Sequence, residues 1–143
     1  EENNVKQNVV VHDPVSYSTV PEYILISNLG LVPLPNIFIW RHQQPLKLLE
    51  YLAMGKTVIV TDSPAHRSII GDNKNGIYFP DVSPRNIAEA IRYAYENKDK
   101  LDEWGKIGRM IIEEKYTWEK VGKELLDYLG KIGQKQYGSK RSV

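Results

Sequence analysis

Lys47 and Glu50 are the two residues whose types and spacing best fit a binding chemistry. They follow Pro45, whose ring suits the first position of a helix, so the first free backbone N–H groups lie near Leu46 and Lys47. Free N–H groups at a helix N-terminus bind anions such as phosphate. Glu50 falls one turn further on about the same face, where its carboxylate can accept hydrogen bonds from sugar hydroxyl groups. The spacing predicts a nucleotide-sugar site, with amides for the phosphate and a carboxylate for the ribose.

The same two side chains also fit an ordinary exposed ion pair between residues three apart on one helix. Such a pair contributes a few tenths of a kcal/mol, roughly, and needs no ligand. On geometry alone, the ion pair is the simpler interpretation of Lys47 and Glu50.

The sequence contains few of the residue patterns that metal sites and other classes of enzyme require. His12, His42 and His66 stand apart in a chain without Cys, so we expect no metal site. No Ser-His-Asp order, Gly-x-Ser-x-Gly, phosphate-binding Walker loop or Gly-x-Gly-x-x-Gly is present. These absences argue against hydrolase, NTPase and dinucleotide-binding functions.

An alternation of strands and helices is predicted to position these residues. Short apolar or β-branched runs predict four buried strands, at 9–11, 29–32, 57–61 and 76–79. Apolar residues at helical spacing predict helices between and after them, including one over 45–54. Buried strands joined by helical crossovers form a parallel sheet covered on both faces. We therefore expect an α/β fold, a three-layer Rossmann-like parallel sheet with helices on both faces.

Ligands of such sheets bind beyond the carboxyl ends of the strands. Loops 12–16, 33–44 and 62–67 follow predicted strands, and the second is long enough to suggest a function. Trp104 and Trp118 instead fall on helical apolar stripes, where we expect core or interface anchors.

Composition narrows the remaining possibilities. The 143 residues fit one domain, over 1–130, followed by a basic and flexible tail over 131–143. A net charge of +1 gives no electrostatic reason to expect a nucleic-acid partner. No apolar run could span a membrane and no leader is evident, so we expect a cytoplasmic protein. We expect the basic tail to be solvated, and the alternative is that it is attracted to an anionic membrane surface. Because the chain begins at Glu1 rather than Met, we expect a piece of a longer protein.

One stretch of the sequence also resembles a known protein family. PLKLLEYLAMGKTVIVTD, residues 45–62, resembles the nucleotide-binding half of retaining GT-B-type glycosyltransferases, the glycosyltransferases group 1 family, with their pattern close to P-x-K-x-x-E-Y-x-A-x-G-K-P-V-I. Three further segments resemble the family in the same order, ISNLGLVPLP, NGIYF and YTWEKVGKELLDYL. The resemblance covers roughly residues 9–129 and implies part of a GT-B C-terminal domain.

The resemblance also implies roles for particular residues. Glu50 is similar to the second acid of the family's Glu-x7-Glu pair and is expected to bind the donor ribose, while the amides of Leu46 and Lys47 hold the diphosphate. The position of the first acid is His42 here, so His42, Gln43 or Gln44 is expected to recognise the sugar hydroxyl groups. The further donor-binding candidate is Pro45, and the nucleobase candidates in the loop after the first predicted strand are His12, Asp13, Pro14 and Val15.

The implied function is the donor side of a glycosyltransferase. The parent protein is expected to transfer a hexosyl unit, with retention, from a nucleotide-diphosphate sugar to an acceptor, without a metal or other cofactor. An acceptor-binding domain and two basic residues that neutralise the diphosphate are expected outside this chain. We therefore expect no transferase activity from the chain alone. We also expect the chain to self-associate through its exposed apolar faces. The alternative is a non-catalytic α/β nucleotide-binding or interaction module that has lost the transfer chemistry.

Overall fold

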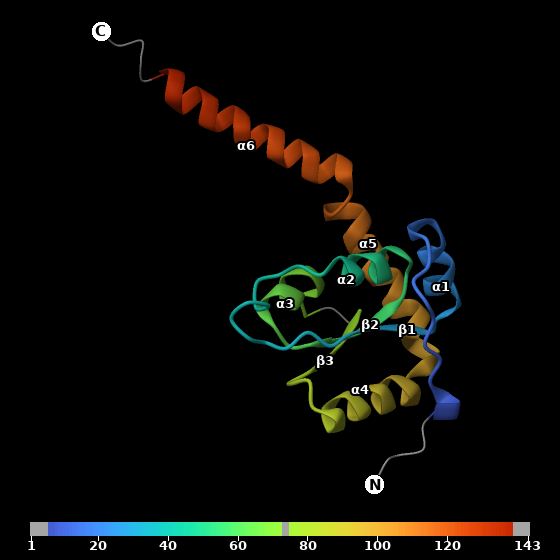
Figure 1. Cartoon of the computed structure of the whole chain (residues 1–143). Coiled ribbons are helices and arrows are strands. Elements are labelled where there is room, and N and C mark those ends of the chain that lie inside the picture. The colour runs from blue at the N-terminus through green and yellow to red at the C-terminus, as the bar shows by residue number, and fades with distance from the viewer. Residues whose placement is uncertain (1–5, 73–74, 139–143) are drawn as a thin grey trace.

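A parallel sheet is the centre of the computed structural model, which describes residues 6–72 and 75–138 (Figure 1). Its strands within these ranges are β1 (Leu29–Val32), β2 (Thr57–Thr61) and β3 (Gly76–Phe79), in the order β1-β2-β3. Ile59 of β2 lies opposite Leu31 of β1 and Ile77 of β3. Every residue of β2 is buried because this strand has a neighbour on each side and helices on both faces.

The helices begin where the local sequence provides a start signal. Ser63 and Ser83 each accept a hydrogen bond from a backbone N–H in the first turn of the following helix, at 3.3 Å, and each precedes a proline that suits the first helical position. The α-helices are α1 (Val20–Ile26), α2 (Leu46–Ala53), α3 (Pro64–Ile70), α4 (Pro84–Glu96), α5 (Leu101–Lys115) and α6 (Trp118–Gly138). Short 3-10 turns occupy Lys6–Asn8, Tyr17–Thr19 and Lys98–Lys100.

Two hydrophobic clusters, one on each face of the sheet, confirm the three-layer α/β fold. The cluster beneath α2, α3 and the end of α5 consists of Val32, Leu48, Leu52, Val58, Val60, Ile69, Ile70 and Ile112. The cluster beneath α4 and the start of α5 consists of Ile59, Ile77, Phe79, Ala90, Ala94, Leu101 and Trp104. Alternate residues of β2 enter opposite clusters because successive side chains of a strand point to opposite faces. Trp104 is thus the core anchor that its helical stripe predicted.

Glycines let α5 lie close to the end of α2. Gly55 ends α2 with a φ of 68°, a conformation that side-chain-bearing residues rarely adopt. Gly105 of α5 faces the Gly55 carbonyl so closely that a Cβ would collide with backbone atoms, and Gly108 is similarly close to Leu52. These contacts hold α2 against the long helix behind it.

The prediction of a strand over residues 9–11 is wrong. Val9, Val10 and Val11 are irregular in structure and are 56%, 76% and 88% exposed. A strand needs a neighbour for its N–H and C=O groups, and no described strand lies beside this segment. Its β-branched composition alone therefore produces neither a strand nor burial.

The C-terminal helix differs from expectation in part. Trp118 is 91% exposed, so it is not a core anchor, and its role as an interface anchor stays a prediction. In Figure 1, α6 leaves the body of the domain at the end of α5 and extends away from the sheet. It continues through Lys131 to Gly138, so the described part of the expected tail is helical, whereas residues 139–143 lie outside the described residues. No described helix combines the length and apolar character needed to cross a membrane.

Candidate functional site

The connections after β1 and β2 meet at the carboxyl ends of these strands. The Asn36 side-chain amide donates to the Asp62 carbonyl at 3.1 Å, and Arg41 Nε donates to Asn36 Oδ1 at 3.3 Å. The Ala65 N–H donates to the Arg41 carbonyl at 3.2 Å. The long loop before α2 is therefore tied to the connection that follows β2, at the edge of the sheet where ligands of such folds bind.

The N-terminus of α2 has no side-chain cap. Pro45 is its N-cap residue, in an extended conformation with φ −75° and ψ 127°, so the helix begins at Leu46, one position after the start at Pro45 that the sequence predicted. The Pro45 carbonyl accepts from the Leu48 N–H at 3.0 Å. Leu46 is exposed beside this terminus. An uncapped terminus leaves its first N–H groups to solvent or to an anion.

A cavity of about 230 Å³ between α1, β1 and α2 contains both residues of the predicted pair. Lys47 and Glu50 line it together with Val15, one of the nucleobase candidates, and with Tyr23 and Tyr51. The structure thus brings three sequence-predicted residues from two distant segments to one place. Glu50 is half-buried there and Lys47 is exposed.

The position of α2 over this cavity depends on a close contact with β1. The Tyr51 ring lies against Gly30, where an added Cβ would collide with it. Lys56, in the turn after α2, donates from Nζ to the Leu25 carbonyl at 2.8 Å and so holds the end of α1. Both elements that form the walls of the cavity are therefore anchored to the sheet or to the turn that enters β2.

The ion-pair interpretation of Lys47 and Glu50 is wrong for this structure. Among the described residues, ion pairs form from Arg67, Arg85 and Arg109, and none joins Lys47 to Glu50. Two potential partners on one helix face that do not pair remain available to a ligand.

The other predicted site residues do not line this cavity. His12 meets Tyr23 edge-on, with ring centroids 5.4 Å apart, and Tyr23 does line the cavity. The remaining candidates that do not line it are Asp13, Pro14, His42, Gln43, Gln44, Pro45 and Leu46. His42, Gln43 and Gln44 are exposed in the long loop directly before α2. Their side chains face solvent close to the uncapped helix end.

An ion-pair network beside the loops was not identified from the sequence. Arg67 of α3 binds Asp62 through two hydrogen bonds, and its hydrogen bonds lower the pKa of the Asp62 carboxyl. The Arg67 guanidinium also lies 4.2 Å from the centre of the Tyr78 ring, and Tyr78 donates to the Gly71 carbonyl at 2.7 Å. Burial raises the pKa of Tyr78 to about 12. Only the five-residue spacing of Asp62 and Arg67 around a helix start hinted at this network.

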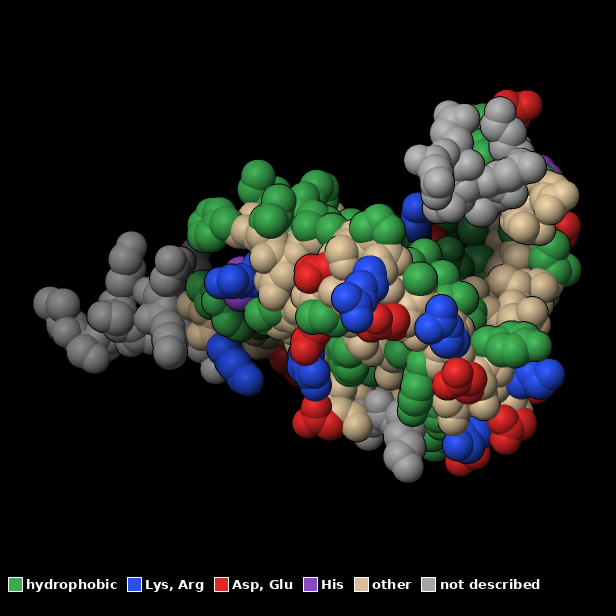
Figure 2. All heavy atoms as spheres, turned by 90° about the horizontal axis from the view of Figure 1, so that it is seen from below, with side chains coloured by type: hydrophobic (Ala, Val, Ile, Leu, Met, Phe, Trp, Pro, Cys, Tyr) green, Lys and Arg blue, Asp and Glu red, His purple; other side chains and the backbone are tan. Residues whose placement is uncertain are grey.

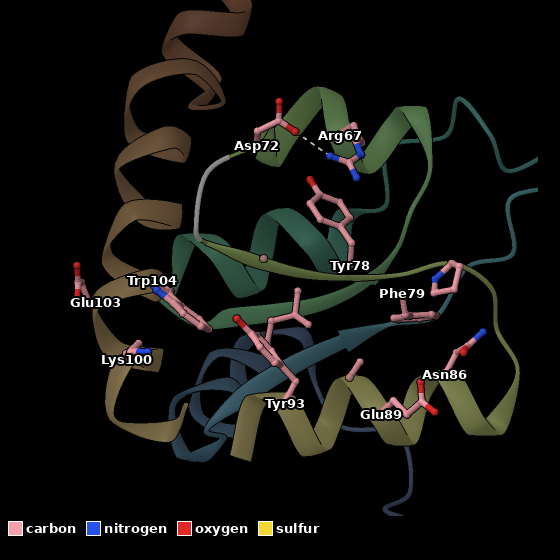
Figure 3. Close-up of a pocket in the computed structure, with 14 residues that line it drawn as sticks. Arg67, Asp72, Tyr78, Phe79, Asn86, Glu89, Tyr93, Lys100, Glu103 and Trp104 are labelled. Atoms are coloured by element: carbon pink, nitrogen blue, oxygen red, sulfur yellow. Dashed lines mark hydrogen bonds and ion pairs between the residues drawn. The ribbon is translucent and has the colours of Figure 1, made fainter. Parts of the chain in front are cut away.

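A larger groove, of about 790 Å³, follows the outer edge of β3 (Figure 3). Tyr93 of α4 and Trp104 of α5 stack in it with ring centroids 6.4 Å apart, and Asn86 and Glu89 lie further along α4. It is at the opposite edge of the sheet from the cavity with Lys47 and Glu50. Sequence reasoning missed it because its walls come from elements that only the fold brings together.

Charge and metal-binding groups are dispersed over the described structure. Figure 2 shows one face of the molecule, on which acidic and basic side chains are interspersed rather than grouped by sign. Within residues 6–72 and 75–138, no three His, Cys, Asp or Glu side chains come together as a metal-binding group. The buried His66 ring instead makes a 2.6 Å hydrogen bond with the Thr61 carbonyl through Nδ1.

Comparisons with known proteins identify the family of the chain. The family model of glycosyl transferases group 1 matches residues 1–110. Spore coat protein SA of Bacillus subtilis (strain 168) is 30% identical over 87 residues, which are 59% of this chain and 23% of that protein. An uncharacterized glycosyltransferase of Methanocaldococcus jannaschii is 29% identical over 77 residues, 54% of this chain and 20% of that protein. The chain thus spans less than a quarter of the length of these relatives, and it belongs to the glycosyl transferases group 1 family.

Proposed function

We propose that this chain is the donor-binding portion of a glycosyltransferase and that the cavity between α1, β1 and α2 binds the nucleoside diphosphate of a nucleotide sugar. One observation carries the proposal: Lys47 and Glu50 line the same cavity, beside an uncapped helix N-terminus, without pairing to each other. A cation and free amides suit the diphosphate, whereas a carboxylate suits hydroxyl groups.

The diphosphate lies against the first turn of α2 in this proposal. The backbone N–H groups of Leu46 and Lys47 donate to phosphate oxygens, and the Lys47 ammonium group adds a mobile positive charge. The helix dipole favours negative charge at this end. Because Lys47 is exposed, solvent screens its contribution, and binding of a nucleoside diphosphate is expected in the millimolar range, about −4 kcal/mol.

The nucleoside extends from the diphosphate into the cavity. Glu50 accepts hydrogen bonds from the ribose hydroxyl groups, and the base lies toward Val15, Tyr23 and the segment with His12. The aromatic ring of Tyr23 offers a surface on which a base can stack. The sugar extends the other way, toward His42, Gln43 and Gln44, whose side chains can donate and accept hydrogen bonds.

Transfer needs more than a donor site. The whole protein would pass a hexosyl group, with retention, from the nucleotide sugar to an acceptor held opposite this crevice, because such transfer is a matter of positioning two substrates. The nucleotide sugar is a substrate, and the proposal needs no metal or other cofactor. For the chain alone we propose binding without transfer.

A second candidate, a nucleotide-binding module without transfer chemistry, is favoured by one observation. His42 occupies the position at which the family resemblance expects an acid, and it is exposed rather than inside the cavity. Measuring binding and transfer separately distinguishes the two candidates, since both predict the first and only one predicts the second in the whole protein.

Backbone amide NMR spectra recorded during titration with UDP, GDP and ADP test the donor site. The expected shifts cluster at Leu46, Lys47, Glu50 and Tyr51. Titration with inorganic pyrophosphate is the matched comparison, and it should move the first turn of α2 without moving residues around Tyr23. An absence of shifts in this region at about ten times the expected dissociation constant would contradict the proposal.

A further inference from the structure

His66 is a buried histidine to which the proposed donor site assigns no role. It lies in the first turn of α3 and is 1% exposed, so residues of this chain itself enclose its ring. Nδ1 of the ring is 2.6 Å from the Thr61 carbonyl oxygen. The contacts of His66 are therefore internal to the chain, whatever covers the outer surface of the domain.

The Thr61 carbonyl determines which nitrogen of the His66 ring carries hydrogen. A carbonyl oxygen only accepts hydrogen bonds, so Nδ1 of His66 is the donor. A neutral imidazole ring has a single N–H group, and its other nitrogen carries a lone pair. The neutral ring is therefore the tautomer with hydrogen on Nδ1, and a substitute for His66 has to donate from the same position.

The His66 ring takes the place of a strand neighbour at the end of β2. Thr61 has a partner on β3 but none on β1, because β1 ends at Val32. Pro33 follows Val32 and has no N–H group to donate. The Nδ1–H group of His66 donates to the Thr61 carbonyl instead, and the His66 backbone N–H donates to Ser63 Oγ at 3.3 Å. These two bonds hold the connection after β2 to the end of the strand.

This connection carries the long loop before α2. The Ala65 N–H, one residue before His66, donates to the Arg41 carbonyl at 3.2 Å. The Asp62 carbonyl accepts from the Asn36 side-chain amide at 3.1 Å. A shift of the connection would therefore displace the loop at both of these contacts.

The segment directly after Arg41 is the one that the proposed function assigns to the donor sugar. Residues 42–44 follow Arg41 without a break and lead into α2. A binding group that is displaced by a fraction of an ångström loses much of its contribution, because its hydrogen bonds depend on distance and angle. The position of the Arg41 carbonyl therefore controls how residues 42–44 meet a sugar.

A different contact positions the proposed diphosphate site. Leu46 and Lys47 belong to α2, which lies against β1 where the Tyr51 ring contacts Gly30. A change at His66 is therefore expected to affect recognition of the sugar while leaving the diphosphate contacts in place.

We propose that His66 is a positioning residue for the donor sugar. Its Nδ1–H group holds the connection after β2 in the conformation that places residues 42–44 against the sugar. The inference rests on the proposed donor site, and it names the side chain that adapts this site to a nucleotide sugar rather than to a nucleotide alone.

Two substitutions at His66 separate donation from Nδ1 from the other properties of the ring. An Asn side chain places its NH₂ group close to the position of Nδ1, whereas a Gln side chain places it close to that of Nε2. His66→Asn should therefore keep the bond to Thr61, and His66→Gln should lose it. Asn36→Ala is a third variant, which releases the loop at an exposed residue and keeps the test available if His66→Gln does not fold.

NMR titrations with UDP and UDP-glucose, and with GDP and GDP-mannose, measure the effect. In the unaltered chain and in His66→Asn, the nucleotide sugar should shift the amides of residues 42–44 beyond the shift that the nucleotide alone produces. In His66→Gln and Asn36→Ala, the affinity gained from the sugar should fall about threefold or more. The shifts at Leu46 and Lys47 should remain in all four proteins.

Two measurements on the ligand-free chain test the contact itself. The nitrogen chemical shifts of the neutral imidazole rings should place hydrogen on Nδ1 of His66, and exposed His42 is the comparison because solvent imposes no fixed tautomer on it. The amides of residues 41–44 should have the same shifts in His66→Asn as in the unaltered chain and different shifts in His66→Gln.

Three results would overturn the inference. They are hydrogen on Nε2 of His66 in the neutral ring, amides of residues 41–44 that stay unchanged in both His66→Gln and Asn36→Ala, and a loss of sugar affinity in His66→Asn equal to that in His66→Gln. Failure of the proposed donor site has a different signature. No nucleotide or nucleotide sugar would then shift Leu46 and Lys47 of the unaltered chain, and the role of His66 toward a donor sugar would fall with it.

Discussion

The Arg67 guanidinium makes a bidentate ion pair with the Asp62 carboxylate, in which Nε donates to Oδ1 at 2.7 Å and Nη2 donates to Oδ2 at 2.9 Å. Asp62 follows the last residue of β2, and Arg67 belongs to the first turns of α3. The contact therefore fixes the angle at which the chain leaves the sheet. The long loop before α2 lies beside it, because the Asn36 side-chain amide of that loop donates to the Asp62 carbonyl.

Stability is expected to fall in acid because of Asp62. Its pKa is lowered in the folded chain by the hydrogen bonds from Arg67, so its contribution is present above the unfolded value of about 4 and is lost as the pH falls through the lower folded value. Thermal unfolding of the chain and of Asp62→Asn between about pH 2.5 and 6 measures this. The variant should show a flatter dependence, whereas Glu113→Gln, which removes a carboxylate paired on an exposed helix, should retain the original one. Equal slopes for all three would contradict the role of Asp62.

Stability is expected to fall in strong base because of Tyr78. Burial raises its folded pKa to about 12, so the unfolded chain releases this proton first, and folding loses stability as the pH rises from about 10 to about 12. Absorbance of phenolate during a pH titration should show one of the nine tyrosines ionising late, and Tyr78→Phe should remove that phase. Tyr17→Phe, at an exposed site, should leave the late phase in place.

Gly105→Ala is expected to destabilise the chain by about 2 kcal/mol or more. A Cβ at this position meets the Gly55 carbonyl and backbone, which cannot move aside as a flexible side chain does. Gly130→Ala is the matched control, because this helical glycine has open space around it and should gain up to about 1 kcal/mol from helix propensity. Urea unfolding measures both, and a neutral effect at Gly105 would refute the close contact between α5 and the turn after α2.

Glu50→Gln is expected to weaken nucleotide binding about tenfold or more, the loss of a hydrogen bond to a charged group, roughly 1.5–3 kcal/mol. Folding should hardly change, because the Glu50 side chain makes no ion pair in the described structure. Glu96→Gln, on exposed α4, should bind as the unaltered chain does. The same NMR titration provides the measurement, and a variant that unfolds yet binds normally when folded would make Glu50 a structural residue.

Val10→Asp is expected to change the free energy of unfolding by less than about 0.5 kcal/mol. The side chain is 76% exposed and lies outside the sheet, so a charge at this position is solvated in both states. A loss of stability above about 1.5 kcal/mol in urea unfolding would mean that this segment is packed after all.

Local signals in the sequence were sufficient for most of the sheet and its helices. These signals are the apolar run of β2, the Ser-Pro starts of α3 and α4, and Gly55 after α2. Each depends on neighbours within a few residues, so each can be recognised from the sequence alone. Lys47 and Glu50 were predicted for the same reason, because one turn of one helix sets their spacing.

What only the tertiary structure decided depends on partners distant in the chain. Val10 is a good strand former that has no strand beside it, and Trp118 lies on an apolar stripe that the described domain does not cover. The meeting of Val15 with Glu50, the stacking of Arg67 on Tyr78 and the groove at β3 arise only when β1, β2 and β3 align. Sequence alone therefore determined the type of most elements, because propensity and periodicity are local. Burial, the missing strand at 9–11 and the assembly of sites depend on which surfaces meet, so they required the fold.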